Sequence, residues 1–122
     1  MSKTALKITY WTTTGIFSVM MLASAVMYFT VPAMAETFEH LGFPTYFRIE
    51  LGVFKIAGAA ALLLPVSPRS KEWAYAGFFI TLISAFIAHI ASGDGPERVV
   101  GPVVFGLALL VSYVTFHRQG RA

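Results

Sequence analysis

Three ionisable side chains lie inside stretches that are otherwise apolar, and their types could support chemistry. They are Glu50, Lys55 and His89. If these stretches cross a bilayer, each charge costs at least about 2.5 kcal/mol at the centre of the membrane, so such residues commonly mark functional sites. Glu50 or His89 could transfer protons as a general acid or base, and Lys55 could bind a ligand or stabilise a developing negative charge.

Lys55 is the most costly of the three, because it lies about 10 Å along a helix from Arg48 at 1.5 Å per residue. Its neighbours on the same helix face are small, namely Gly52, Gly58 and Ala59. Small residues let two membrane helices approach closely, so this pattern predicts that Lys55 faces protein and not lipid. Two interpretations stay open: a structural lysine bonded to helix carbonyls or to Ser24 and Ser84, or a contact to a ligand or substrate.

Glu50 and Lys55 are five positions apart, about 140° around a helix, so each should find partners on other helices. His89 is three residues from Ser92, at the end of its apolar stretch, and therefore at a depth close to that of Glu50. This spacing predicts a Glu50–His89 contact between two helices. A buried histidine that donates to a backbone carbonyl is the alternative for His89.

We expect Arg48, His40 and Tyr46, which lie in or beside the connection between the first two apolar runs, to be near the level of Glu50 and His89. Together these residues predict a polar pocket in the outer half of a bundle. The predicted ligand-binding residues are Lys55, Glu50, His89, Arg48, His40 and Tyr46, with Glu50 and His89 as catalytic candidates. We expect no such polar pocket in the inner half of the bundle, where Trp73, Tyr75 and His117 are interpreted as membrane-interface anchors.

Other chemistries are disfavoured by what the sequence lacks. The chain has no cysteine, which excludes disulfide exchange, thiolate metal sites and Fe–S clusters. Its three histidines, His40, His89 and His117, are dispersed, so we expect no metal site. The nine Lys and Arg residues are scattered beside apolar runs, a pattern typical of membrane insertion and not of nucleic-acid binding.

The elements that would position these residues are apolar helices. Hydrophobic residues make up 57% of the 122 residues and charged residues only 12%, against about 25% charged in soluble domains. Four apolar runs, at about 12–29, 49–64, 73–91 and 99–116, approach the length of about 20 residues that a membrane-spanning helix needs. The sequence predicts an all-α integral membrane protein, a single domain over 1–122 that forms an antiparallel bundle of four transmembrane helices.

The connection between the first two runs predicts one further helix. Pro32 can open a helix, and Gly42 with Pro44 can end it. Its apolar edge would be Met34, Phe38 and Leu41, so we expect a short amphipathic helix that caps the outer surface. The connections at 65–69 and 92–96 are tight, which favours antiparallel neighbours on each side of them.

Basic residues predict the orientation of the bundle. Six lie on one side: Lys3, Lys7, Arg69, Lys71, Arg118 and Arg121. Only Arg48 and Arg98 lie in the loops on the other side, so the positive-inside rule places both termini in the cytoplasm. A signal peptide cleaved near 33–35 is an alternative, but the first apolar run is longer than the usual h-region of about 7 to 15 residues. We therefore expect the first helix to be retained.

Several stretches resemble the DoxX-like family of small four-helix bacterial membrane proteins, and the likeness covers nearly the full chain. The stretches that carry it are KITYWTT at 7–13, HLGFP at 40–44 with Tyr46 and Phe47, ELG at 50–52 through Lys55 and Gly58 to Pro65, EWAYAGF at 72–78, and Ala88-His89 before Gly93-Asp94. The resemblance implies a bundle in the bacterial inner membrane. The broader family takes its name from a subunit associated with thiosulfate:quinone oxidoreduction, and other relatives are accessory or chaperone-like proteins.

Three functions are compatible with these observations. The leading hypothesis is an accessory or ligand-binding protein that holds a small lipophilic molecule, with a quinone as a candidate. The second is a membrane enzyme of the oxidoreductase or isomerase type, with Glu50 or His89 as acid or base and Lys55 as electrostatic stabiliser. The third is an assembly partner, in a homo-oligomer or a larger complex, that uses the small-residue faces Gly52/Gly58 and Gly101/Gly106.

Overall fold

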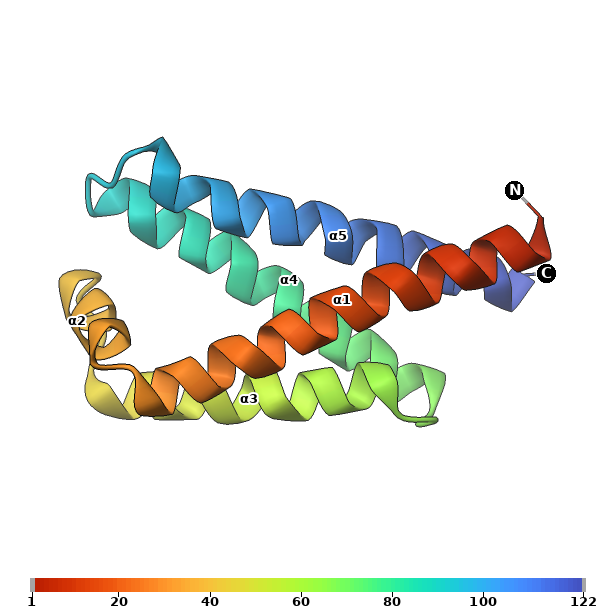
Figure 1. Ribbon diagram of the computed structural model, residues 1–122, viewed down its shortest axis with the longest axis horizontal. Helices are drawn as coiled ribbons and strands as arrows, with labels where there is room; N and C mark the ends of the chain where they lie inside the picture. Colours follow the sequence, from red (N-terminus) through yellow and green to blue (C-terminus); the bar gives the residue numbers. More distant parts are fainter. Residues whose placement is uncertain (1, 122) are drawn as a thin grey trace.

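The computed structural model describes residues 2–121, and the side chains of residues 2–119. The described chain is all-helical, and its five helices are α1 (Lys3–Thr30), α2 (Pro32–His40), α3 (Thr45–Leu63), α4 (Pro68–Ala91) and α5 (Pro96–Arg121). The long helices α1, α3, α4 and α5 alternate in direction along the chain (Figure 1). Arg121, one of the basic residues used to predict orientation, has a side chain outside the described part.

The four long helices close into a bundle. α1 packs against α3 and α5, and α4 packs against α5 and α3. The short helix α2 contacts α3 and α1 at the end of the bundle opposite both chain termini (Figure 1). We call the end of the bundle at α2 the α2 end, and we call the opposite end, where both chain termini lie, the terminal end.

Local signals set where the helices begin and end. Ser2 Oγ accepts from the backbone N–H of Ala5 (3.1 Å), and Ser67 Oγ accepts from that of Ser70 (3.2 Å), so serines cap the starts of α1 and α4. Gly42 and Gly93 follow α2 and α4 with positive φ values of 84° and 79°, which only glycine adopts readily. The long helices begin earlier than the apolar runs, because caps and prolines determine helix starts whereas hydropathy marks only their apolar parts.

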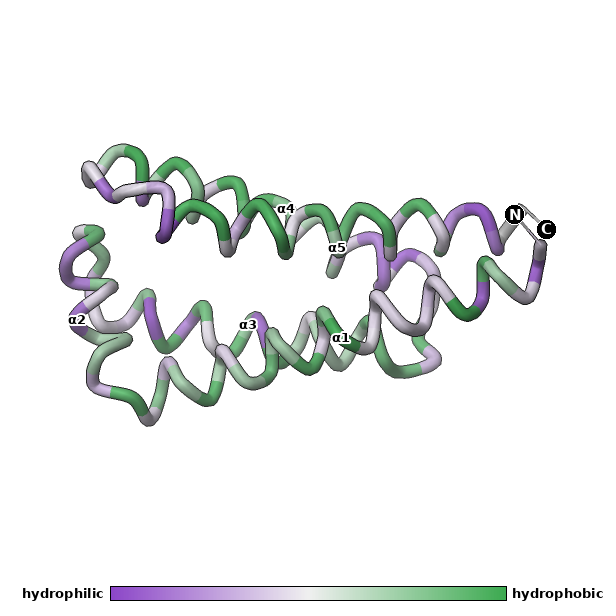
Figure 2. Tube along the Cα trace, turned by 45° about the horizontal axis from the view of Figure 1, so that its top comes forward, coloured by the Kyte–Doolittle hydropathy of each residue, from purple (hydrophilic) through white to green (hydrophobic). Residues whose placement is uncertain are grey.

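The helices are apolar on their outer surfaces. Lys3–Thr30, Pro68–Ala91 and Pro96–Gln119 are each long and apolar enough to cross a membrane. Side chains such as Ile16 (60% exposed) face outward, which a soluble protein seldom tolerates over so large an area. Figure 2 shows that hydrophobic residues dominate the long helices while hydrophilic residues gather toward the two ends.

Two glycines on α3 allow close contacts with its neighbours. A Cβ atom on Gly52 would lie 2.7 Å from Phe29 of α1, and one on Gly58 would lie 2.7 Å from Phe78 of α4. The small-residue face around Lys55 is therefore used within this chain. The buried core lies beyond it, toward the terminal end, and contains Phe17, Met21, Leu62, Tyr75, Phe78 and Leu109.

Candidate functional site

A cavity of about 550 Å³ lies at the α2 end, and we call it the α2 cavity. Side chains from α1, α2, α3 and α4 line it, together with the loop after α2. Its walls are mainly aromatic and aliphatic, with Phe38, Phe43, Phe47, Phe54, Met34 and Leu51 among them. The polar lining residues include Ser24, Tyr28, Ser84, Lys55 and His89. Two of the predicted site residues, Lys55 and His89, thus lie on one cavity.

Lys55 is buried in the wall of this cavity, with 7% of its surface exposed. Its Nζ donates to Tyr28 OH (2.6 Å) and to Ser24 Oγ (3.1 Å), both on α1. The same Nζ lies 4.3 Å from the centre of the Tyr28 ring, close enough for a cation–π interaction. The inward orientation and the Ser24 partner agree with the sequence-based expectation. Tyr28 was missed, and Ser84 lines the cavity without bonding to Lys55.

At the α2 end, Asp94 is paired with two histidines. His89 Nδ1 lies 2.6 Å from Asp94 Oδ2, and His40 Nε2 lies 2.8 Å from Asp94 Oδ1. Hydrogen bonds from His89 and then from His40 lower the pKa of the Asp94 carboxyl below its usual 3.8. Since His40 ends α2 and Asp94 precedes α5, this cluster links α2 to the α4–α5 pair.

The predicted Glu50–His89 contact is wrong. His89 bonds to Asp94, and Glu50 is exposed on α3. The reason is the angle of about 140° between Glu50 and Lys55 on one helix, because turning Lys55 inward turns Glu50 outward. Asp94 was predicted only as part of the tight connection at 92–96, although an acidic residue five positions after His89 could have suggested this pairing.

The other predicted site residues lie beside the α2 cavity and do not line it. Tyr46 was predicted as a ligand-binding residue, but it is 72% exposed and does not line the cavity. His40 is paired with Asp94. Arg48 Nη1 donates to the backbone carbonyl of Tyr28 in the last turn of α1, where carbonyl groups lack helical partners and a positive charge is favourable. Arg48 therefore ties the start of α3 to the end of α1.

The terminal end also has buried polar groups, contrary to the prediction that the inner half lacks a counterpart. Lys71 is 9% exposed, and its Nζ donates to the carbonyls of Leu62 (2.9 Å), Leu64 (3.1 Å) and Ala61 (3.2 Å). These carbonyls belong to the end of α3, which has no further helical turn to bond them. Lys71 was predicted only to mark orientation, and it also caps α3.

Hydroxyl groups form a second buried cluster near Lys71. Tyr75 OH lies 2.7 Å from Ser112 Oγ, which also bonds to Thr14 Oγ1. Tyr75 is therefore a core residue, and its interpretation as an interface anchor is wrong. His117 faces Glu72, whereas Trp73 is 75% exposed. Sequence reasoning missed this cluster because Ser and Thr are too common in membrane helices to be informative singly.

The described residues also bear on metal ligation and on assembly. No group of three or more His, Asp or Glu side chains within the described residues is arranged to hold a metal ion. Phe29 packs against Gly52 and Phe78 packs against Gly58, so these two glycines are not available to a partner protein. A Cβ atom on Gly101 or Gly106 would meet nothing within 4 Å, so the α5 face remains open.

Long apolar helices, a lipid-compatible surface and a cavity with a buried lysine define a helical integral membrane protein. The sequence profile of the DoxX-like family matches residues 12–112, and this chain belongs to the DoxX-like family. The match confirms the resemblance seen in the sequence and includes all residues of the α2 cavity. No curated protein and no solved structure matches the chain significantly.

Proposed function

We propose that this DoxX-like protein binds a small lipophilic molecule in the α2 cavity, as an accessory or ligand-binding protein of the bacterial inner membrane. The observation that carries the proposal is the buried ammonium group of Lys55 in the wall of a mainly apolar cavity. A volume of about 550 Å³ suits a ligand, since such sites span about 300–1,000 Å³. A quinone is one candidate, because its carbonyl oxygen could accept from Lys55.

The proposal includes four membrane spans, with α3 as the fourth. The 19 residues of α3 extend about 28 Å, close to the hydrocarbon thickness of about 30 Å. Its charged residues are compatible with a span, because Lys55 is buried, Arg48 bonds to α1 and Glu50 lies near the helix start. In this topology α2 lies at the periplasmic surface.

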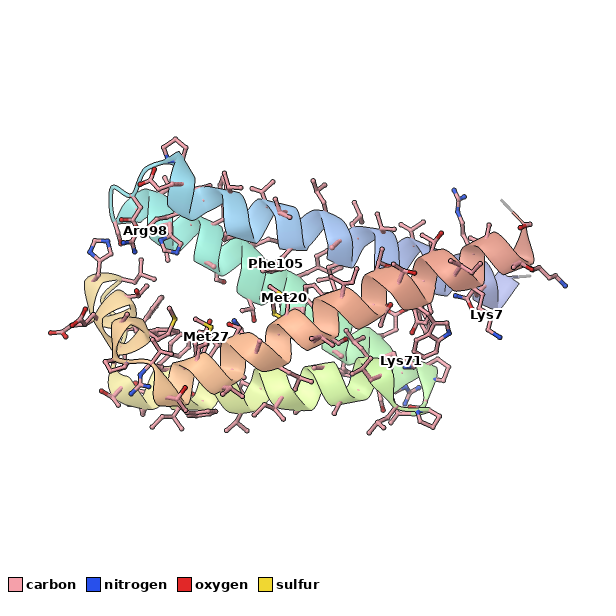
Figure 3. The ribbon with its side chains drawn as sticks, in the orientation of Figure 1. Lys7, Met20, Met27, Lys71, Arg98 and Phe105 are labelled. Carbon is pink, nitrogen blue, oxygen red and sulfur yellow. The ribbon has the colours of Figure 1, made fainter. Side chains whose placement is uncertain are left out.

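The same proposal places both termini in the cytoplasm. Basic residues concentrate at the terminal end, and Arg98 is at the α2 end; Figure 3 shows Lys7 and Lys71 toward the former and Arg98 at the latter. Arg69 and Arg118 also belong to the terminal end, because they lie in the first turn of α4 and the last turns of α5. An excess of Lys and Arg on one side supports a cytoplasmic assignment for that side.

Thermal melting with added lipophiles tests the proposed binding. Purified protein in a neutral detergent should melt at higher temperature with decylubiquinone or other lipophiles, because ligand at a hundred times its Kd adds about 2.7 kcal/mol of stability. Ala85→Phe should abolish the shift by filling the cavity, since Ala85 lines it. Ala76→Phe on the exposed side of α4 is the matched control and should retain the shift.

Lys55→Met separates a role of the lysine from a role of the cavity. The variant should show a smaller ligand-induced shift than wild type, because the hydrogen-bond donor is lost. If wild type and Lys55→Met melt unchanged across a broad panel of quinones, lipids and other lipophiles, the proposed binding function is refuted.

An enzymatic function is the second candidate, and the His89–Asp94 pair favours it. A carboxylate bonded to one ring nitrogen fixes the orientation of an imidazole and leaves its other nitrogen for acid–base chemistry. His89 lines the cavity and bonds to Asp94 through Nδ1, so Nε2 is the available nitrogen. A strain with His89→Gln should accumulate the same metabolite as a deletion strain; indistinguishable metabolite profiles of the wild-type, variant and deletion strains would count against catalysis.

The remaining candidate partner is another protein or a second copy of the chain. The open face at Gly101 and Gly106 supports contact there, since small residues allow helices to approach. Gly106→Leu should then reduce the molecular mass of the complex isolated in mild detergent, with Gly77→Leu as the control. An unchanged mass for both variants would exclude this face.

A further inference from the structure

Two lysines are buried to nearly the same extent, yet only one has its hydrogen bonds completed by the chain. Lys71 donates to three backbone carbonyls, one for each ammonium proton. Lys55 donates to two hydroxyl groups, which leaves one N–H without an acceptor among the described residues. Lys71 is therefore satisfied by the fold, whereas Lys55 is not.

Lys55 also lacks a negative partner. No carboxylate of the described residues forms an ion pair with it, and the carboxylate nearest in sequence on α3, Glu50, is exposed. Asp94 is held by two histidines, and the other acidic residues of the α2 end, Glu36, Glu39 and Glu97, are exposed. A buried charge without a counterion is costly, so a bound anion would stabilise this site.

The partners of Lys55 can themselves donate to such an anion. Because Ser24 and Tyr28 accept from Lys55 through their hydroxyl oxygens, their O–H groups remain as donors, and the described residues give neither of them an acceptor. Lys55 N–H, Ser24 O–H and Tyr28 O–H thus supply three donors on one cavity wall. A carboxylate can accept all three, and hydrogen bonds to a charged group are about twice as strong as neutral ones.

The surroundings of this donor group are suited to an apolar chain. A second hollow of about 420 Å³ lies between α3 and α4, with Gly58 and Phe78 in its lining. It shares Leu51, Phe54, Lys55 and Thr81 with the α2 cavity. The two hollows therefore meet at Lys55, and a chain longer than the α2 cavity could continue between α3 and α4 toward lipid.

We propose that the ligand of the α2 cavity is a lipophilic carboxylate, an amphiphile with one anionic head that pairs with Lys55 and an apolar chain that occupies the two hollows. This inference rests on the proposed binding function and specifies the chemical class of the ligand. One buried cation matches one negative charge, and the mainly apolar walls match the chain.

Lipids that carry different heads test this inference: oleate, methyl oleate and oleyl alcohol share one chain and differ only in the head, and phosphatidylglycerol supplies a phosphate head on two chains. Oleate, methyl oleate, oleyl alcohol and phosphatidylglycerol are added separately to the full-length protein in neutral detergent, and Kd is obtained from the concentration dependence of the melting temperature. Oleate should bind wild type at least about tenfold more tightly than methyl oleate, which corresponds to about 1.4 kcal/mol. Lys55→Met should lower oleate affinity to about the level of the ester, and it should lower ester affinity much less, because the ester can lose only a neutral hydrogen bond and not an ion pair.

Two further variants keep the test valid if Lys55→Met does not fold. Tyr28→Phe removes one O–H donor but keeps the ring that packs on Phe38, with a centroid distance of 4.9 Å, and it should weaken oleate binding several-fold without affecting methyl oleate. Lys7→Met removes an exposed lysine at the terminal end, and it should leave both affinities unchanged. A nonspecific detergent effect of oleate would be equal in all variants.

Each outcome distinguishes this inference from the function on which it rests. Equal affinity of wild type for oleate and methyl oleate overturns the carboxylate assignment. If decylubiquinone stabilises the protein without any preference for charged lipids, the binding function stands and the carboxylate assignment fails. Lys55-dependent binding of phosphatidylglycerol at the strength of oleate replaces the carboxylate with a phosphate head. No stabilisation by any lipophile refutes both proposals.

Discussion

At the scale of single residues, Lys71 provides the clearest link between a side chain and stability. Lys71→Met removes the donors for three carbonyls at the end of α3, one of them in a buried bond and two in partly buried bonds, and leaving a buried acceptor unbonded costs about 1–3 kcal/mol. We expect the free energy of unfolding, measured by denaturant titration in mixed micelles, to fall by that amount. Lys7→Met should have almost no effect, and equal stability of the two variants would contradict the capping role.

Asp94 should make the stability of the α2 end depend on pH. Because its folded-state pKa is lowered from 3.8 by His89 and His40, the carboxylate stabilises the fold fully above pH 3.8 and loses this contribution as the pH falls below that value. The melting temperature of wild type should therefore exceed that of Asp94→Asn at neutral pH. The difference should shrink in acid below 3.8, and a constant difference would argue against the linkage.

The residue scale shows what sequence spacing can and cannot reveal. The inward orientation of Lys55 followed from Gly52, Gly58 and Ala59, because small neighbours occur where helices meet. Its partner Tyr28 did not follow, because identifying it requires the rotation of α1 relative to α3. The exposure of Glu50 was implicit in its angle of about 140° from Lys55, yet pairing by depth alone placed it against His89.

At the scale of helices, the two close contacts of α3 should differ in their tolerance of a methyl group. Gly58→Ala places a Cβ against Phe78, which is 4% exposed and held in the core, whereas Gly52→Ala meets Phe29, which is 43% exposed. Overpacking in a core costs about 1–3 kcal/mol. Replacing glycine by alanine inside a helix gains about 0.5–1 kcal/mol.

We therefore expect Gly58→Ala to destabilise the protein and Gly52→Ala to be nearly neutral. Gly77→Ala on α4 meets no atom within 4 Å, so it should be stabilising and reports the helix-propensity gain alone. Thermal melting of the three variants in one detergent measures the order. If Gly52→Ala is the most destabilising variant, the α1–α3 contact and not the α3–α4 contact is the rigid one.

Helix formation could be predicted from hydropathy, but packing partners could not. The apolar runs lie almost entirely within the long helices, since apolar side chains on a helix can contact either lipid or another helix. The hydroxyl cluster of the terminal end depends on which faces of α1, α4 and α5 meet, and a helix that is apolar nearly all round gives no signal of its rotation. Lys71 was unrecognised for the same reason.

At the scale of the whole molecule, the four-span topology can be tested by labelling. The chain has no cysteine, so single cysteines report position without background. Glu39→Cys on α2 and Ser70→Cys near the start of α4 are exposed at opposite ends of the bundle. A membrane-impermeant maleimide should label Glu39→Cys in intact spheroplasts, and it should label Ser70→Cys only after permeabilisation.

These two positions flank α3, so the result is specific for the fourth span. Thr4→Cys, at the start of α1, should behave as Ser70→Cys does if the termini are cytoplasmic. Labelling of Glu39→Cys and Ser70→Cys from the same side would show that α3 does not cross the membrane.

The buried core and the α2 cavity are built from different residues. None of the six core residues at the terminal half of the bundle lines the cavity. Apart from Leu82, which lines the cavity and also packs against this core, and Phe38, which is itself buried, the cavity wall can therefore change without altering the core contacts. The fold of the bundle therefore does not determine the chemistry of the cavity, and a ligand identified for one DoxX-like protein should not be transferred to another from shared fold alone.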